Sequence, residues 1–236
     1  MKRFSPLVAA AGLMVLAGAA QAVPALQLYI DGATYDSVNE TWVVTSNSFD
    51  LWVLGDTGGS GNIYGVNLVA SGYGSGTVSI TPTTTSNPLA GGDPSTPVTP
   101  IDYGKMSTSD ALTFFAGTAI TQGVTTHDEF ANATDHHYWG IGDFTLQDSQ
   151  IGDWSGGTPG SFPDQGQINV YHVDINGYDS VHFDAFDHVV SGDHIKYYKA
   201  PFSHDATDAV PEPGTMALLG LGLAGAAARK LRKKTS

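Results

Sequence analysis

Apolar and aromatic residues occur along positions 23–208 in short runs, and Gly, Asn, Asp and Ser separate the runs. Runs of about four to eight residues rich in Val, Ile, Tyr, Phe and Trp are typical of β-strands. Helical spacing of apolar residues is not sustained over three turns, although a brief capped helix fits within 107–117. The pattern favours an antiparallel sandwich or barrel, and we predict an all-β fold, a jelly-roll-like antiparallel β-sandwich. The expected strands cover 26–30, 41–45, 49–54, 64–70, 76–81, 168–175, 180–186 and 194–198.

Two segments depart from this pattern of runs. Residues 81–100 hold five prolines, and proline donates no hydrogen bond to a strand ladder. We predict a long surface loop there, with a domain boundary as the alternative. Residues 206–209 are small and polar, and we predict a short linker.

The N-terminus has the pattern of an export signal. Lys2 and Arg3 precede a 14-residue apolar run at 7–20, and Ala-Gln-Ala follows at 20–22. A basic start, a short apolar helix and small residues at the end are typical of a secretory signal peptide, which we predict at 1–22. A membrane helix is the alternative, but spanning needs about 20 apolar residues.

The C-terminus consists of Pro-Glu-Pro at 211–213, an uncharged stretch at 214–228 and a basic cluster at 229–234. As a helix, the 14 residues 215–228 would span about 21 Å, less than the roughly 30 Å of a bilayer core. Basic residues stay in the cytoplasm, so residues 23–208 form the predicted exported domain. Residues 209–236 form the predicted sorting tail, with a single transmembrane helix too short for a strong permanent anchor.

The predicted exported domain is strongly acidic. Its basic residues are Lys105, Lys196 and Lys199, against 22 of the chain's 23 acidic residues, which gives a net charge of −19. This charge excludes nucleic acid as a partner and argues against anionic lipid, but it favours divalent cations. The chain has no cysteine, which excludes disulfides, thiol catalysis and thiolate metal sites.

The three consecutive parts of the tail resemble the PEP-CTERM protein-sorting signal of Gram-negative bacteria. The resemblance implies recognition and cleavage near the motif by an exosortase, after passage through the secretion machinery and removal of the signal by signal peptidase. It also implies transient anchoring in the inner membrane and then a place at the cell surface or outside the cell. The matching residues are Pro211, Glu212, Pro213, Arg229, Lys230, Arg232, Lys233 and Lys234.

The rest of the chain carries a second resemblance. The segments PALQLYIDGATYD, ETWVVTSNSFDLWVLGD and APFSHDA resemble the choice-of-anchor extracellular proteins, in particular their subgroup N. Members carry a similar β domain on different sorting tails. The family has no established activity, so the resemblance implies no catalytic residue.

Residues 168–189 contain the main candidate for a metal site. Asn176-Gly177 is a hairpin signal, and apolar residues alternate at 171–175 and again at 181–185. If both apolar sets face the core, the polar residues between them share one exposed face and are suited to a divalent metal. The alternative is a solvated face of cross-strand pairs. The candidate ligands are His172, Asp174, His182 and Asp184.

Other motifs give weaker signals. The DINGYD run at 174–179 has part of a calcium loop but lacks its late glutamate, so calcium is one expectation and an Asx turn the other. The HDEF run at 127–130 and the DHHYWG run at 135–140 would need an α/β context for phosphoesterase chemistry, and the strand pattern does not supply it. We find no nucleophile elbow, P-loop or zinc-protease motif, and we predict no enzymatic activity and no resident cofactor.

The four tryptophans divide into two pairs. Trp42 and Trp52 lie inside expected strands, which predicts that they belong to the core. Trp139 and Trp154 lie beside glycine-rich segments and are the candidates for an exposed sugar-stacking surface. From these features we expect a structural or adhesive protein that meets exopolysaccharide, other surface proteins or cations. The alternatives are a secreted hydrolase, with glycans as one expected substrate class, and a stable single-pass surface protein.

Overall fold

The computed structural model describes the backbone of residues 25–39, 41–84, 99–107, 109–110, 132–154, 157–191, 194–199 and 205–209. The predicted signal peptide, the sorting residues of the tail and most of the Pro-rich segment lie outside this part. Within the described residues, no helix combines the length and apolar character needed to span a membrane. Ser109 and Asp110 are helical, whereas 108 and 111–117 of the expected helix lie outside the described residues.

Apart from turns and connections, the described part consists of β-strands, most of which pair antiparallel. This confirms the all-β prediction and is consistent with a β-sandwich. The strands are β1 (Leu26–Ile30), β2 (Thr34–Asp36), β3 (Thr41–Val44), β4 (Ser48–Gly55), β5 (Ile63–Thr84), β6 (Ile101–Met106), β7 (Asp135–Phe144), β8 (Ser149–Ile151), β9 (Asp164–Ser191), β10 (His194–Lys199) and β11 (Asp205–Ala209).

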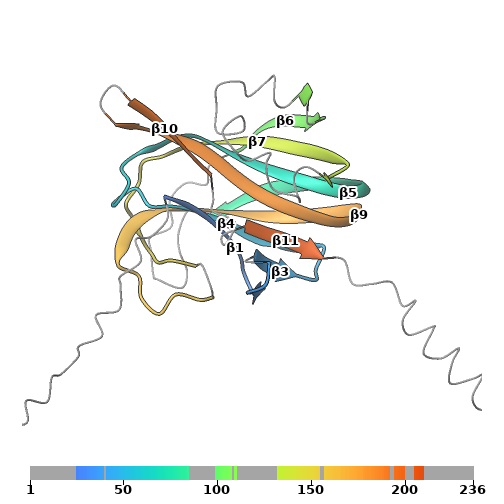
Figure 1. Ribbon diagram of the computed structural model, residues 1–236, viewed down its shortest axis with the longest axis horizontal. Helices are drawn as coiled ribbons and strands as arrows, with labels where there is room; N and C mark the ends of the chain where they lie inside the picture. Colours follow the sequence, from blue (N-terminus) through green and yellow to red (C-terminus); the bar gives the residue numbers. More distant parts are fainter. Residues whose placement is uncertain are drawn as a thin grey trace, which may run out of the picture.

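Two long strands, β5 and β9, form the central pair of the sheet. They pair antiparallel from Ile63 opposite Val189 to Thr84 opposite Val170, and Figure 1 shows them running side by side across the molecule. The free edge of β9 is taken by β8, β4, β11 and β10 along its length. On the other side of β5 lie β7 and then β6. The paired strands β5 and β9, which we call the ribbon, therefore lie at the centre of the sheet.

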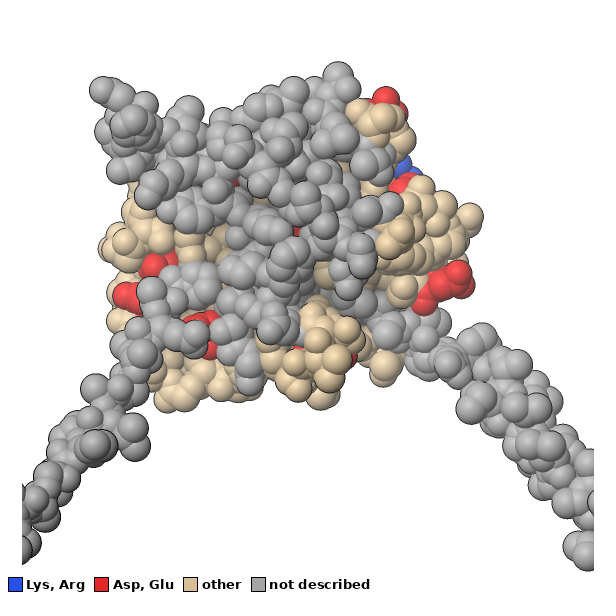
Figure 2. Space-filling model, viewed as in Figure 1, with Lys and Arg blue, Asp and Glu red and all other residues tan. Residues whose placement is uncertain are grey.

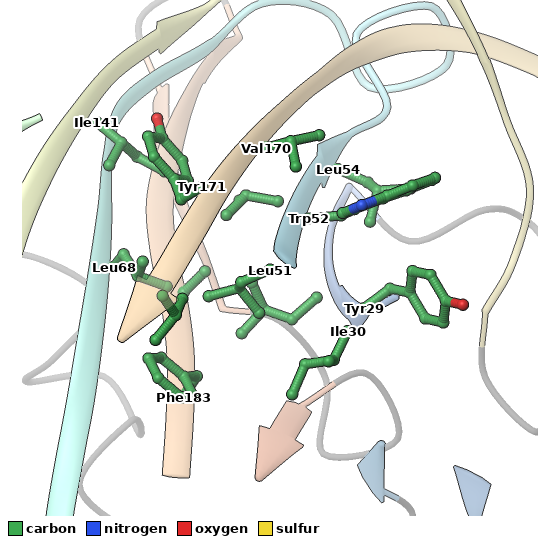
Figure 3. Close-up of a cluster of buried hydrophobic side chains, with 14 of the residues drawn as sticks. Tyr29, Ile30, Leu51, Trp52, Leu54, Leu68, Ile141, Val170, Tyr171 and Phe183 are labelled. Carbon is green, nitrogen blue, oxygen red and sulfur yellow. The ribbon is translucent and has the colours of Figure 1, made fainter. Parts of the chain in front are cut away.

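The hydrophobic core lies between the two halves of this ribbon. Phe49 on β4, which pairs with the first half of β9 at Val173, contacts Phe183 of the second half with ring centroids 5.9 Å apart. The two halves of β9 therefore face each other across one core. Figure 3 shows side chains that converge there from β1, β4, β5, β7 and β9, among them Ile30, Leu51, Leu68, Ile141, Tyr171 and Phe183.

The ribbon bends where a hairpin was expected. β9 continues through Asn176 and Gly177 without a turn, so the hairpin prediction is wrong. Gly177 has φ 88° and Gly74 on β5 has φ 89°, and the register shifts on both sides of Gly74. Gly177, which was expected to form a turn, is therefore part of a β-bulge, and this bulge bends β5 and β9 together. A Cβ at Gly76 would lie 2.4 Å from the carbonyl oxygen of Asn176, so the bend also requires glycine for close approach.

The bend explains why several expected strands merge or move. The runs at 64–70 and 76–81 both belong to β5, and those at 168–175 and 180–186 both belong to β9. Segments with a weak strand pattern also become strands where neighbouring strands offer them backbone pairing. Residues 206–209, the predicted linker, form most of β11, because β3 and β9 offer partners on both of its edges.

The start of the Pro-rich segment is part of β5. Pro82 pairs with Tyr171 on β9, while the pairing of β5 with β7 ends at Gly72. A proline fits there because, among the described residues, β5 has no second neighbour at that point. The predicted loop itself, at 85–98, lies outside the described residues. β5 before it and β6 after it both flank β7, so the chain on either side contributes to one sheet.

Candidate functional site: a polar sheet face

A flat polar surface lies over β4, β9 and β5 near the bend. The register places Asp174 between Ser48 and Ser79, and it places His172 between Asp50 and Thr81. Directly opposed residues share a face, and these six side chains are exposed or half-buried. We call this surface the polar sheet face; it consists of Ser48, Asp50, Ser79, Thr81, His172 and Asp174.

His172 is the centre of the polar sheet face. Its Nδ1 lies 2.8 Å from Asp50 Oδ1 and its Nε2 lies 3.0 Å from Ser48 Oγ. The same Nε2 is 3.7 Å from Asp174 Oδ1. The side chains of His172 and Asp174 are 42% and 62% exposed, so the network is open to a partner from solvent.

The electrostatics of the face favour a charged imidazole. The hydrogen bond to Asp50 raises the pKa of His172 above its ordinary value, and the charges of Asp174 and Asp50 act in the same direction. Protonated His172 partly neutralises the two carboxylates and presents its Nε2–H to Ser48 or to a ligand. The face therefore offers a cation, carboxylates and hydroxyls within one small area.

The order of atoms Ser48 Oγ, His172 Nε2, His172 Nδ1 and Asp50 Oδ1 matches that of a serine hydrolase triad. Two features oppose this chemistry. A raised pKa increases the fraction of His172 that is protonated at a given pH and so cannot accept the Ser48 proton. The backbone N–H of Ser48 donates to Ser46 Oγ, so it is not directed at a site for an oxyanion. The arrangement is better suited to binding than to acyl transfer.

The other two predicted ligands lie elsewhere. His182 and Asp184 are 3% and 5% exposed at the side chain, with His182 Nε2 3.6 Å from Asp184 Oδ1. They follow the bend in β9, whereas His172 and Asp174 precede it, so the exposed pair and the buried pair lie on different parts of the strand. The structure therefore does not bring the four predicted ligands together at one point. In the part of the chain that the structure describes, no three or more His, Asp or Glu side chains are grouped suitably for a metal ion.

His182 and Asp184 instead belong to a buried polar cluster that spans β7, β5 and β9. Ser71 pairs with His136 on one side and with His182 on the other, and Ser71 Oγ lies 2.9 Å from His136 Nδ1. Burial lowers the pKa of His136 to about 4, against the charges of Asp184 and Asp135. The cluster therefore holds a neutral imidazole at neutral pH.

Sequence reasoning missed His136 because the DHHYWG run was examined for enzyme motifs and not as a strand. Its alternation was the available signal: His136 and Tyr138 are buried together on one face of β7. Burial raises the pKa of Tyr138 well above its ordinary value. The cluster is enclosed, which suits a structural role.

A small groove borders the polar sheet face on β5. It has a volume of about 240 Å³ and is lined by β5 residues 78–82, the start of β6 and Trp139. Asp102 Oδ1 at its rim lies 2.7 Å from His137 Nε2. Although burial opposes the change, hydrogen bonds from His137 and from the Gly104 N–H lower the pKa of Asp102. The groove thus joins apolar walls to an ionised carboxylate.

All four tryptophans are buried. Trp42 and Trp52 are core residues as predicted, but Trp139 and Trp154 are only 3% and 0% exposed, so the prediction of exposure is wrong. Trp154 stacks on Tyr29 at 4.1 Å and also packs against Trp42 and Trp52. These aromatic contacts form part of the core and leave no exposed tryptophan platform for sugars.

Acidic residues are exposed on more than one side of the domain. Figure 2 shows acidic atoms at both the left and the right of the face in view. Lys105, a basic residue of the described part, is engaged internally: its Nζ lies 3.0 Å from Asp135 Oδ2 and 4.9 Å from the centre of the Tyr178 ring. The described surface is therefore predominantly anionic.

Comparison with known proteins identifies the C-terminal tail. Residues 209–233 match the family model of the PEP-CTERM protein-sorting motif, which confirms the predicted sorting signal. The match supports a protein that is exported and sorted at its C-terminus, and it implies processing by an exosortase after transient membrane anchoring. No curated protein matches the chain. The comparisons give no support to the resemblance of the β domain to choice-of-anchor proteins.

Proposed function

We propose that this chain is an exported surface or matrix protein whose tail is removed by an exosortase and whose β domain has an adhesive or structural role. The observation that carries this proposal is the sorting motif at 209–233, which adjoins an acidic, folded β domain. The net charge of −19 over residues 23–208 suits neither nucleic acid nor anionic lipid as a partner.

The polar sheet face is the proposed contact with exopolysaccharide. Its hydroxyls, carboxylates and imidazole can exchange hydrogen bonds with sugar hydroxyls, and wet polar contacts of this kind do not require a deep pocket. The adjoining groove extends the surface with apolar walls and the carboxylate of Asp102. The net negative charge favours a neutral polymer, or an acidic one bridged by calcium that Asp50, Asp174 and the polymer hold together.

The sorting part of the proposal is tested in the native host by cell fractionation and mass spectrometry. The full chain should be recovered at the surface or in the medium, and its C-terminus should lie near Pro213. A chain lacking 211–236 should be released without processing at the membrane. Recovery of the full chain with 229–234 intact in the inner membrane would instead support the single-pass alternative.

The binding part is tested by co-sedimentation of the mature protein with exopolysaccharide purified from the same host. Asp174→Asn should weaken binding several-fold because Asp174 is the most exposed carboxylate of the His172 network. The matched control is Asp179→Asn, which removes the same charge from an exposed position of the same strand, outside the polar sheet face. Equal losses in both variants would indicate that net charge, not this face, governs binding.

A secreted hydrolase is the second candidate, favoured by the order of the Ser48, His172 and Asp50 atoms. Incubation of the mature protein with a fluorophosphonate probe distinguishes the two functions. Covalent labelling of Ser48 that is lost in His172→Asn would favour the hydrolase. An unlabelled Ser48 would favour the binding role.

A further inference from the structure

The last described strand, β11, is an inner strand of the sheet. It pairs parallel with β3, from Asp205 opposite Thr41, and antiparallel with β9, where its last residue Ala209 is opposite Ser180. Figure 1 shows β11 packed alongside the domain up to its end. The backbone is therefore paired on both edges from Ala206 to Asp208, and Ala209 is paired with β9 alone.

The Pro-Glu-Pro block at 211–213 follows this strand almost at once. Val210 is the single residue between Ala209 and Pro211, and the two residue steps between them span at most about 7 Å. An enzyme that binds a substrate chain in an extended form needs access to the backbone on either side of the motif. When β11 is paired, only a few ångströms of chain between the sheet and Pro211 are available to the enzyme.

The composition of β11 makes it suited to local opening. Its five residues, Asp-Ala-Thr-Asp-Ala, include one β-branched residue and two aspartates, and Asp and Ala are depleted in strands. Segments that make few apolar contacts open at lower free energy than the rest of a domain, and the sequence of β11 contains no large apolar residue. Release of five residues would add about 17 Å of extended chain before the motif.

We propose that pairing of β11 controls the sorting reaction: the exosortase acts on chains whose β11 has separated from β3 and β9. The folded state of the domain then sets the rate at which the tail is removed. This inference rests on the proposed function, because it concerns the same cleavage. It adds that the substrate is the motif together with an opened strand.

The first test lengthens the chain between the strand and the motif. A six-residue Gly/Ser segment is inserted between Ala209 and Val210 of the full-length chain, and pulse-chase labelling in the host measures the half-time of tail removal. We expect processing to be about tenfold faster, which corresponds to ~1.4 kcal/mol of local opening that is no longer needed. Equal half-times for parent and insertion variant would overturn the inference.

The second test locks the strand in place. Ala209 and Ser180 are directly opposite and the chain has no cysteine of its own, so Ala209→Cys with Ser180→Cys can form a single cross-strand disulfide. Oxidised cells should retain the tail, and added dithiothreitol should restore its removal. Ser180→Cys alone is the control and should be processed like the parent.

The outcomes separate this inference from the proposed function. Processing of the locked chain at the parent's rate would overturn the control by β11 and leave exosortase sorting intact. A parent chain that keeps 211–236 throughout the chase would overturn the proposed sorting, and with it this inference.

Discussion

At the residue scale, two histidines of one sheet differ in their charge because of their surroundings. His172 is half-exposed and hydrogen-bonded to Asp50, which raises its pKa. His136 is enclosed beside Ser71, and burial lowers its pKa to about 4. Desolvation disfavours an imidazolium, whereas an adjacent carboxylate favours it. The first histidine is therefore accessible from solvent, and the second is enclosed in the domain.

The contrast can be measured by NMR titration of the mature protein. At about pH 5.5, His172 should be protonated and His136 neutral, because their pKa values are shifted in opposite directions from 6.5. Asp50→Asn should return the pKa of His172 towards its ordinary value. Asp179→Asn should leave it unchanged. Equal titration of both imidazoles would contradict the description of the two sites.

The His172–Asp50 pair also predicts a pH-dependent effect on stability. A raised folded-state pKa stabilises the fold below the unfolded value of about 6.5, and this contribution is lost as pH rises through the folded pKa. Asp50→Asn should therefore lower the melting temperature at about pH 6 and have little effect at about pH 9. The effect at pH 6 should stay within the roughly 0–1 kcal/mol of exposed ion pairs.

At the scale of elements, the joint bend of β5 and β9 decides which surfaces exist. It turns one ribbon into two facing halves, and it places the polar sheet face before the bend and the buried polar cluster after it. Gly177 adopts φ 88°, and a Cβ there would lie 2.8 Å from the carbonyl oxygen of Ser75. The bend therefore depends on the absence of a side chain.

Gly177→Ala should destabilise the domain by about 1–3 kcal/mol, because alanine at this position is strained and meets backbone. Gly160→Ala is the matched control. Gly160 has open space around its Cβ position and no positive φ, so the substitution should be neutral or stabilise by up to about 1 kcal/mol. Chemical denaturation of both variants measures the difference. Similar free energies of unfolding would show that the bend does not require glycine.

At the scale of the whole molecule, strands distant in sequence complete one another. β9 pairs with β4 from the start of the domain and with β11 from its end, while β11 also joins β3. Contacts between such distant segments form late and cooperatively in folding. The domain is therefore completed by the strand that directly precedes the sorting motif.

A pair of truncations tests this dependence. A chain ending at 209 keeps β11 and should melt close to the mature protein. A chain ending at 204 leaves β3 and β9 each with an unpaired edge where β11 lay, so it should melt several degrees lower, in keeping with the ~1.4 kcal/mol expected for opening of β11. Calorimetry provides the measurement. Equal melting temperatures for the two chains would indicate that β11 contributes little to the fold.

Local patterns proved informative where a feature depends on neighbours in sequence. The strand at Leu26–Ile30 and the burial of Trp42 and Trp52 follow from runs of apolar residues. The motif at 209–233 is likewise linear and was confirmed by comparison. Alternation correctly assigned the apolar residues of 171–175 and of 181–185 to the core, since a strand presents successive side chains to opposite faces.

Features that depend on distant partners were decided only by the tertiary structure. Asn176-Gly177 is compatible with a hairpin and with a bulge, and the pairing of β5 along both sides of it selects the bulge. Trp154 is buried because Tyr29, more than a hundred residues away, supplies a stacking surface. The sequence alone determined the alternation of faces and the sorting signal. Tertiary packing determined which polar residues contact one another and which are buried. Burial and strand pairing depend on distant segments, and no local pattern specifies those segments.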